Sequence, residues 1–313
     1  MRLPYEKVNH IDFPSGIDFT EKDGAFVITM HQDGTSANMQ SNAAAFEAWA
    51  LVAKSAGYER VVLSESESTR DLQGIEELHY NRFLYRVSCF AKGFNWFSIS
   101  DELKAKVEIF ENTELKQDLF VNAPLSEPKI PDLKSHEAVM ERRLVQDGNC
   151  DLLNDILGTK IGKFYQQLPF GLFKDRVITE NAVMPSDKAA IDIWGLDGRV
   201  FHLVELKVRD NQDLGVLSEL FFYACFINEM YCNRHLETKD PADLRTYKKD
   251  GELYRGYSQL INANIDSVVA HILTEKKHPR LDDAFAELQK HKLDGIVFAN
   301  AKIHPLFDTV SES

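Results

Sequence analysis

The sequence predicts an α/β protein in which a mixed sheet flanked by helices follows a separate N-terminal α/β accessory domain. Apolar residues make up 44% of the 313 residues, which is enough for packed cores. A chain of this length fits roughly two domains of about 150 residues each. In the second half, strand-like stretches alternate with helical ones, which is typical of a mixed sheet with helices packed against it.

Composition and charge exclude several classes of protein. The longest unbroken apolar run covers 220–227, far below the roughly 20 residues of a membrane-spanning helix. Residues 1–6 carry no apolar stretch, so we expect no secretory signal. The four cysteines form no C-x-x-C pair, which fits a reducing cytoplasm, the predicted location. The formal net charge is −13, so any surface that binds nucleic acid must be local.

A proline-rich segment divides the chain. Residues 122–135 hold three prolines and show no apolar periodicity. We therefore expect an accessory domain over 1–123, a linker over 124–132 and a second domain over 133–313. In the first domain, Asp23-Gly24 predicts a hairpin turn between strands 17–20 and 25–30. The remaining elements expected there are a helix over 38–55, a strand over 60–63 and a helix over 75–91.

The second domain is expected to begin with a helix over 133–146. The other helical patterns cover 214–230 and 281–290. The strand-like stretches cover 164–173 (broken at Pro169), 189–194, 200–208, 267–274 and 295–301.

The strands 189–194 and 200–208 gather charge on one face. If Asp197-Gly198 fills the two central turn positions, Asp192 pairs with Leu203. Side chains alternate along each strand, so one face carries Asp192, Glu205 and Lys207. Glu205 is then the diagonal neighbour of Asp192, at about 7 Å. Buried charges are usually paired or bound to a metal, so this face predicts either a site or a structural ion pair of Lys207 with a carboxylate.

Two helices add further candidates. Glu219 and Tyr223 lie one turn apart on the helix over 214–230, where Tyr223 could equally be a core aromatic. Glu137 falls in the middle of the apolar stripe of the helix over 133–146, and Glu141 falls near its edge. A glutamate in such a stripe indicates a groove, a metal or a hydrogen-bond network.

These residues resemble the PD-(D/E)xK nuclease superfamily, which has the restriction-endonuclease-like fold. The resemblance covers roughly 133–301. Asp192 and the Glu205-Leu206-Lys207 tripeptide resemble the signature acid and E-x-K, although Ile191 stands where the motif has Pro. Glu219 to Tyr223 is similar to the Q-x-x-x-Y element of the RecB-like nucleases, with Glu in place of Gln.

The resemblance implies a nuclease that depends on Mg²⁺ or Mn²⁺ and cleaves DNA rather than RNA, in defence, restriction or repair. The catalytic residues that it implies are Asp192, Glu205, Lys207, Glu137, Glu219 and Tyr223. The metal ligands that it implies are Asp192, Glu205, Glu137 and the backbone carbonyl of Leu206. Carboxylate and carbonyl oxygens suit these cations, and Lys207 could stabilise charge on the phosphate.

The segment 245–257 interleaves basic residues with tyrosines, a composition that suits phosphate contact and base stacking. An ordinary solvated loop is the other interpretation. The residues expected to contact nucleic acid are Arg245, Tyr247, Lys248, Lys249, Tyr254 and Arg255.

Two other functions stay open. The chain could be a catalytically inactive protein of the nuclease fold that binds nucleic acid or a protein, an interpretation that the acidic net charge favours. It could also be an unrelated α/β protein in which Lys207 forms a structural ion pair. The accessory domain could recognise substrate, bind a partner protein or form a homodimer; no membrane partner is expected.

Overall fold

The structure is a computed structural model of the chain. It describes residues 14–67, 71–121, 136–146, 148–185, 189–208, 213–239, 248–249, 252–253, 256–274 and 278–299. Within these ranges no helix combines the length and the apolar character needed to cross a membrane.

The first half is built on a four-stranded sheet of order β1-β2-β3-β4. Its strands are β1 (Ile17–Lys22), β2 (Ala25–Met30), β3 (Val61–Glu65) and β4 (Phe97–Ile99). β1 is antiparallel to β2, and β2, β3 and β4 run parallel. Asp23 and Gly24 both have positive φ, 51° and 72°, in the two-residue turn between β1 and β2. The hairpin predicted at Asp23-Gly24 is therefore confirmed.

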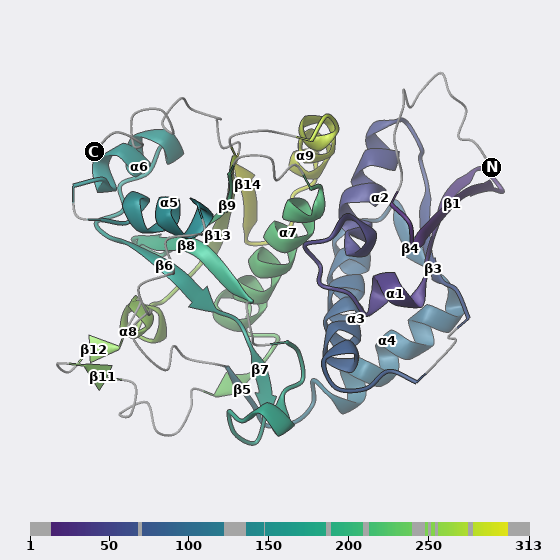
Figure 1. The fold of residues 1–313 in the computed structure, drawn as a ribbon, viewed down its shortest axis with the longest axis horizontal. Coiled ribbons are helices and arrows are strands. Elements are labelled where there is room, and N and C mark those ends of the chain that lie inside the picture. The colour runs from purple at the N-terminus through teal and green to yellow at the C-terminus, as the bar shows by residue number, and fades with distance from the viewer. Residues whose placement is uncertain are drawn as a thin grey trace.

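Helices separate this sheet from the rest of the chain. They are α1 (Gln32–Thr35), the short 3-10 helix at Asn42–Ala44, α2 (Phe46–Ser55), α3 (Ile75–Gly93) and α4 (Asp101–Thr113). In Figure 1, α2 and α3 lie between the N-terminal sheet and helix α7. The helix predicted over 38–55 begins only at Phe46. Residues before it form a loop whose polar side chains bond to Asp213, Leu214 and Glu219 instead.

The second half is built on a five-stranded mixed sheet of order β14-β13-β9-β8-β6. Its strands are β6 (Phe164–Pro169), β8 (Ala190–Asp197), β9 (Val200–Lys207), β13 (Ser267–Thr274) and β14 (Ile296–Ala299). β6, β8 and β9 are antiparallel neighbours, whereas β9, β13 and β14 run parallel. The mixed sheet flanked by helices is thus as predicted.

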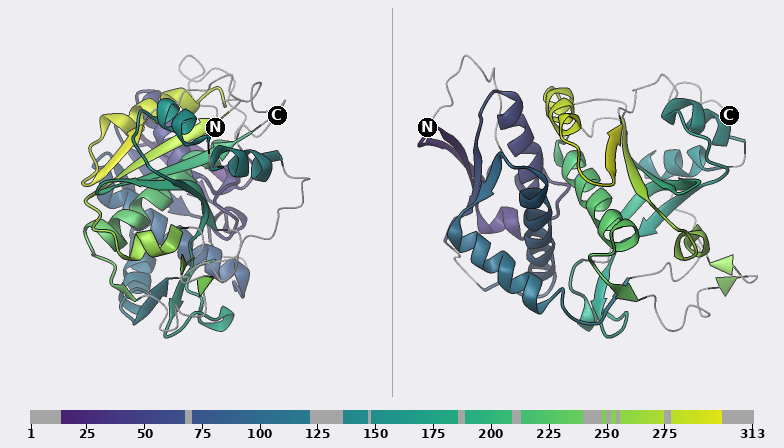
Figure 2. Two further views of the ribbon diagram at one scale, coloured as in Figure 1. Left: turned by 90° about the vertical axis from the view of Figure 1, so that its left-hand side faces the viewer. Right: turned by 180° about the vertical axis from the view of Figure 1, so that it is seen from behind.

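Helices cover both faces of this sheet. α5 (His136–Leu144) and α6 (Cys150–Leu157) pack on one face, where Met140 and Leu153 share an apolar cluster with Val204 and Leu206 of β9. α7 (Gly215–Ile227) packs on the other face, near Leu203. The helix predicted to reach Met230 continues as a π-helix over Asn228–Cys232. α9 (Leu281–Lys290) lies beside α2, as the view from behind in Figure 2 shows.

The remaining elements are short. They are β5 (Leu119–Val121), β7 (Leu172–Lys174), the 3-10 helix at Thr179–Asn181, β10 (Thr238–Lys239), β11 (Lys248–Lys249), β12 (Glu252–Leu253) and α8 (Tyr257–Ile261). β5 pairs with β7 and β10, which joins the end of the first half to the second half.

The register predicted for the β8–β9 hairpin is wrong by two residues. Asp197 pairs with Val200 and Trp194 with Leu203, so the central turn positions are Gly198 and Arg199. Gly198 supplies the positive φ, 61°, that the first central position needs, and Asp197 can then remain in the strand. A shift of two leaves every side chain on its predicted face, because strand side chains alternate with a period of two.

One hydrophobic core runs through both halves. It includes Trp49 and Phe90 from the first half and Phe201 and Phe221 from the second. The linker predicted over 124–132 lies outside the described residues, so the proposed domain boundary stays a prediction.

A buried polar network also connects the first half of the chain to the second half. Arg86 forms an ion pair with Glu47, donating from Nε to Oε1 at 2.7 Å, and Ser218 Oγ donates to Glu47 Oε2 at 2.8 Å. Arg86 is 2% exposed and Glu47 is 0% exposed. Both charges are therefore removed from water and depend on each other.

Replacing one member of this pair should be far more harmful than replacing both. Arg86→Met leaves the Glu47 carboxylate buried without its cation, so we expect the free energy of unfolding to fall by about 3–5 kcal/mol. The double variant Arg86→Met/Glu47→Leu should recover most of that loss. Urea unfolding of the three proteins measures the difference. A single variant as stable as the wild type would contradict a buried ion pair.

Two histidines inside the second sheet should make stability depend on pH. His271 Nε2 lies 3.1 Å from His202 Nδ1. Burial, and then the neighbouring His202, lowers the pKa of His271 from 6.5 to about 3. The unfolded chain therefore binds a proton that the folded chain does not as the pH falls below 6.5, and folded-state stability decreases there.

The wild type should lose about 2 kcal/mol more unfolding free energy than His271→Asn when the pH falls from 7 to 5. Urea unfolding of both proteins at the two pH values measures this. The comparison with the variant removes the contribution that the other titrating groups make to the loss of unfolding free energy in both proteins. Equal losses would show that His271 is protonated in the folded protein.

Candidate functional site

The candidate site lies where β8 and β9 separate, at the end of the hairpin away from its turn. The paired part of the two strands ends at Ile193 and Val204. Beyond it, Asp192 Oδ2 accepts a hydrogen bond from the backbone N–H of Leu206 at 2.8 Å. Continuing the observed register sets Asp192 opposite Glu205 rather than diagonal to it. The corrected turn thus brings the two carboxylates nearer than the sequence predicted.

Lys207 is buried among carboxylates. Its Nζ lies 3.2 Å from Glu219 Oε2, 3.7 Å from Glu205 Oε2 and 3.9 Å from Asp192 Oδ2. Burial alone would lower the pKa of Lys207, but the surrounding carboxylates, Glu219 first, raise it well above its usual range. The ammonium is therefore held in its charged form. Asp192, Glu205, Glu219 and Lys207 all come together, as expected from strand and helix geometry.

Helix α5 contributes two glutamates one turn apart. Carboxylate oxygens of Glu137, Glu141 and Asp192 lie within 4.8 Å of one another. Glu141 was not among the predicted site residues. Its spacing of four from Glu137 was the available signal, because such residues share a helix face. Gln167 Nε2 donates to Glu141 Oε2 at 2.6 Å, from a residue of β6 with a φ of 55°.

The carboxylates that the structure brings together differ from the metal ligands predicted from the sequence. Glu205 is not in the three-carboxylate group; it faces Lys207 and its buried Oε1 has no hydrogen-bond partner among the described residues. Leu206 enters the site through its N–H. Ligation of a metal by the Leu206 carbonyl therefore stays a prediction, as does ligation by Glu205.

Negative charge is in excess at the site. Burial raises the pKa of Asp192 to about 7, despite the opposing effect of Lys207. Burial and then Asp192 raise the pKa of Glu141 to about 8, and the pKa of Glu205 rises well above its usual range for the same two reasons. Burial also raises the pKa of Glu137. Burial thus disfavours the charged form of these carboxylates, and a bound cation would offset that effect.

The donor set fits a hard divalent cation. Oxygen atoms of carboxylates are the ligands that Mg²⁺ and Mn²⁺ prefer, and Mg²⁺ usually takes one or two carboxylates and keeps several waters. Glu137, Glu141 and Asp192 offer three such carboxylates at an opening of the sheet, without cysteine or histidine. Zinc, which favours sulfur and nitrogen ligands, fits this group less well.

The first half of the chain forms one wall of the site. A cavity of about 340 Å³ is lined by Asn38, Gln40, Ser41, Glu137, Lys207, Asp213 and Val216. Gln40 Nε2 donates to Glu219 Oε1 at 2.6 Å. A Cβ at Gly215 would lie 2.0 Å from the Gln40 carbonyl oxygen, so only glycine permits this approach. Gln40 could not be found from sequence, because it lies 179 residues from its partner.

Tyr223 is placed one turn after Glu219 but away from the cavity. It is 1% exposed and its ring packs against Phe170, with centroids 5.5 Å apart. Burial, and then Glu219, raises the pKa of Tyr223 well above its usual range. Tyr223 is thus a neutral buried group behind the carboxylates. Arg82, 3% exposed, lies near it; burial lowers the pKa of Arg82 to about 10.

The predicted nucleic-acid contacts lie outside the described part of the chain. Arg245, Tyr247, Tyr254 and Arg255 are not among the described residues. Lys248 and Lys249 are described only as the strand β11. Contact of this segment with nucleic acid stays a prediction.

Comparison with known proteins gives no further assignment. The chain matches no family model, no curated protein and no solved structure.

Proposed function

We propose that this chain is a divalent-metal-dependent nuclease that hydrolyses phosphodiester bonds, with DNA as its substrate rather than RNA. One observation carries the proposal: a buried ammonium, Lys207, stands among carboxylates at the open end of a hairpin and reaches a cavity. A lysine used only in a structural ion pair needs one carboxylate, whereas here three lie within 4 Å.

The order of elements supports the same proposal. Helix α5 precedes the antiparallel strands β6, β8 and β9 in the chain, and helix α7 and the parallel strand β13 come after them, with shorter elements in between. Asp192 and Glu205, which resemble the signature acid and the Glu of the E-x-K in the PD-(D/E)xK superfamily, lie on the neighbouring strands β8 and β9. The family itself remains part of the proposal.

Each residue has a chemical task in this reaction. Glu137, Glu141 and Asp192 would hold the cation, which supplies an activated water and offsets negative charge on the phosphate. Lys207 would place its ammonium where charge develops on the phosphate oxygens. Glu219 accepts from Gln40 and faces Lys207, so it would fix the ammonium in position. Glu205, whose buried carboxyl group lies beside Lys207, would orient the same group or the water.

A second candidate function is an inactive protein of the same fold that binds nucleic acid or a protein. The net charge of −13 favours the protein-binding form of this function, because a net negative charge opposes binding to the phosphate backbone. This protein would shift a DNA band in a gel without metal and would leave the DNA intact.

Lys207→Met should abolish cleavage. Removal of the ammonium leaves the developing phosphate charge unopposed, so we expect the rate on linear and plasmid DNA with Mn²⁺ or Mg²⁺ to fall by at least about 100-fold. Circular dichroism and the melting temperature check that the variant folds.

Lys160→Met is the matched control, because Lys160 is an exposed lysine of the same half. It should cut at the wild-type rate. If Lys207→Met cuts as fast as the wild type, the measured activity comes from a contaminant and the proposal fails.

Glu141→Gln tests the metal ligands that the structure selects. It replaces one of the three carboxylates by a neutral amide, which is a weaker ligand for the cation, so the dissociation constant for Mn²⁺ should rise by at least about tenfold. Titration calorimetry with Mn²⁺ alone measures it without reference to activity. Glu180→Gln, at an exposed glutamate, is the control. If Glu205→Gln weakens binding and Glu141→Gln does not, the ligand set predicted from sequence is the correct one.

A further inference from the structure

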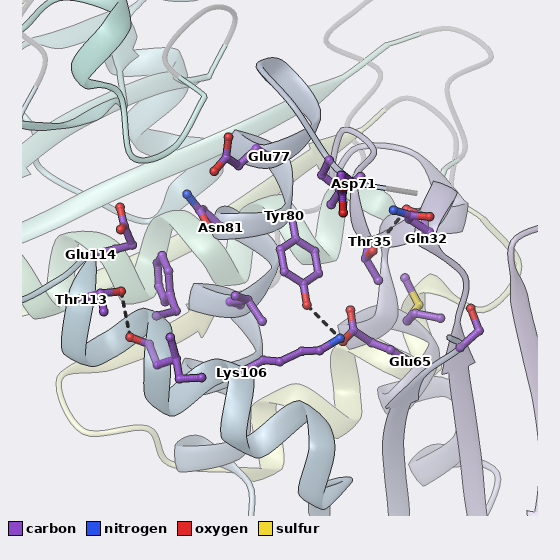
Figure 3. A pocket seen from close by; sticks show the side chains of 16 residues that line it. Gln32, Thr35, Glu65, Asp71, Glu77, Tyr80, Asn81, Lys106, Thr113 and Glu114 are labelled. Atoms are coloured by element: carbon purple, nitrogen blue, oxygen red, sulfur yellow. Dashed lines mark hydrogen bonds and ion pairs between the residues drawn. The ribbon is translucent and has the colours of Figure 1, made fainter. Parts of the chain in front are cut away.

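A second cavity lies in the first half of the chain, away from the candidate nuclease site. Its volume is about 460 Å³, and its walls come from the ends of β2 and β3 and from helices α3 and α4 (Figure 3). Met30 and Glu65, the last residues of β2 and β3, both line it. Crevices at the carboxyl ends of parallel strands are the usual ligand sites of open α/β sheets. The volume falls within the roughly 300–1,000 Å³ of small-molecule sites.

The base of the cavity is polar but electrically balanced. Glu65 accepts hydrogen bonds from Lys106 Nζ at 2.9 Å and from the Tyr80 hydroxyl at 3.1 Å. Figure 3 shows the Tyr80 hydroxyl and the Lys106 ammonium meeting at the Glu65 carboxylate. The cation of Lys106 is therefore already matched by an anion, and it leaves no charge at the base for an anionic ligand to neutralise.

Two carboxylates at the rim of the cavity have no ion-pair partner among the described residues. Asp71 and Glu77 line the cavity, and neither has an ion-pair partner within the described ranges. The third rim carboxylate, Glu114, is neutralised by Lys174 at 2.5 Å. Two carboxylates thus remain to attract a positive group to this mouth.

The cavity lining also includes apolar side chains. They belong to Met30, Leu72, Leu84, Ile109 and Phe110. Ile109 is 64% exposed, which makes it one of the few large apolar side chains of the described residues to face solvent. A ligand that covered Ile109 would remove apolar surface from water and gain affinity for that reason.

We propose that this cavity binds a small organic cation, an amine or a guanidinium carried on an apolar body. The apolar body would lie against Ile109, Phe110 and the Tyr80 ring. The cationic group would lie between Asp71 and Glu77. This binding site is independent of the proposed nuclease activity, and nothing in its geometry reaches Lys207.

A charge series of one ligand shape tests the proposal. Phenethylamine, 2-phenylethanol and 3-phenylpropionate share an apolar body and carry a positive, a neutral and a negative group. Titration calorimetry on the full chain should show binding of phenethylamine, binding of the alcohol about tenfold weaker, and none of the carboxylate. The affinity for phenethylamine should fall as salt is added, because the rim charges are exposed.

A double variant assigns the binding to this rim. Asp71→Asn/Glu77→Gln should raise the dissociation constant of phenethylamine about tenfold. Glu59→Gln/Glu108→Gln removes the same charge from exposed positions that do not line the cavity and should bind like the wild type.

The proposal is overturned by any of three results. These are no binding of phenethylamine at millimolar concentration, equal binding of all three compounds, and equal affinity of the rim variant and its control. The compound series on the wild type remains decisive even if the rim variant fails to fold.

Discussion

The burial of one ammonium group among carboxylates organises the second half of this protein. A charge taken out of water is stable only where opposite charges and hydrogen bonds surround it closely. Lys207 obtains these from β8, β9 and α7, through Asp192, Glu205 and Glu219. Burial, and then the neighbouring carboxylates, raise the pKa values of Asp192 and Glu205, and a further positive charge would favour their ionised forms. The carboxylates that stabilise the buried Lys207 are therefore also the groups that favour a bound cation.

The first half of the chain takes part in this arrangement. Gln40 bonds to Glu219, and its backbone fits against Gly215 at the start of α7. The buried pair of Arg86 and Glu47 reaches the same helix through Ser218. A movement of the first half would thus disturb the group that holds Lys207. If the chain is a nuclease, its N-terminal half is a component of the site as well as an attached unit, and it also carries a cavity of its own.

Local sequence patterns were sufficient to predict most of the helices and strands. The hairpin at Asp23-Gly24 follows from two residues that tolerate positive φ. The strand Ser267–Thr274 and the helix Leu281–Lys290 agree with their predicted limits, because apolar periodicity reports on burial directly. The predicted helix over 38–55 starts late for a reason that no local pattern holds. Its first residues bond to side chains and backbone of α7 and the loop before it, whose positions depend on the folded sheet.

The sequence by itself determined which face of the β8–β9 hairpin carries Asp192, Glu205 and Lys207, because alternation along a strand survives a register error of two. It also placed Glu137 and Glu219 on helices that pack against that sheet. Only the tertiary structure decided the distances, the place of Glu141 beside Asp192 and the contact of Gln40 with Glu219. Such contacts join residues that are far apart in the chain, and their geometry depends on the packing of several elements at once. A periodic pattern indicates which residues are buried and which face of a strand or helix they share. It does not indicate which residue from a distant part of the chain contacts that face.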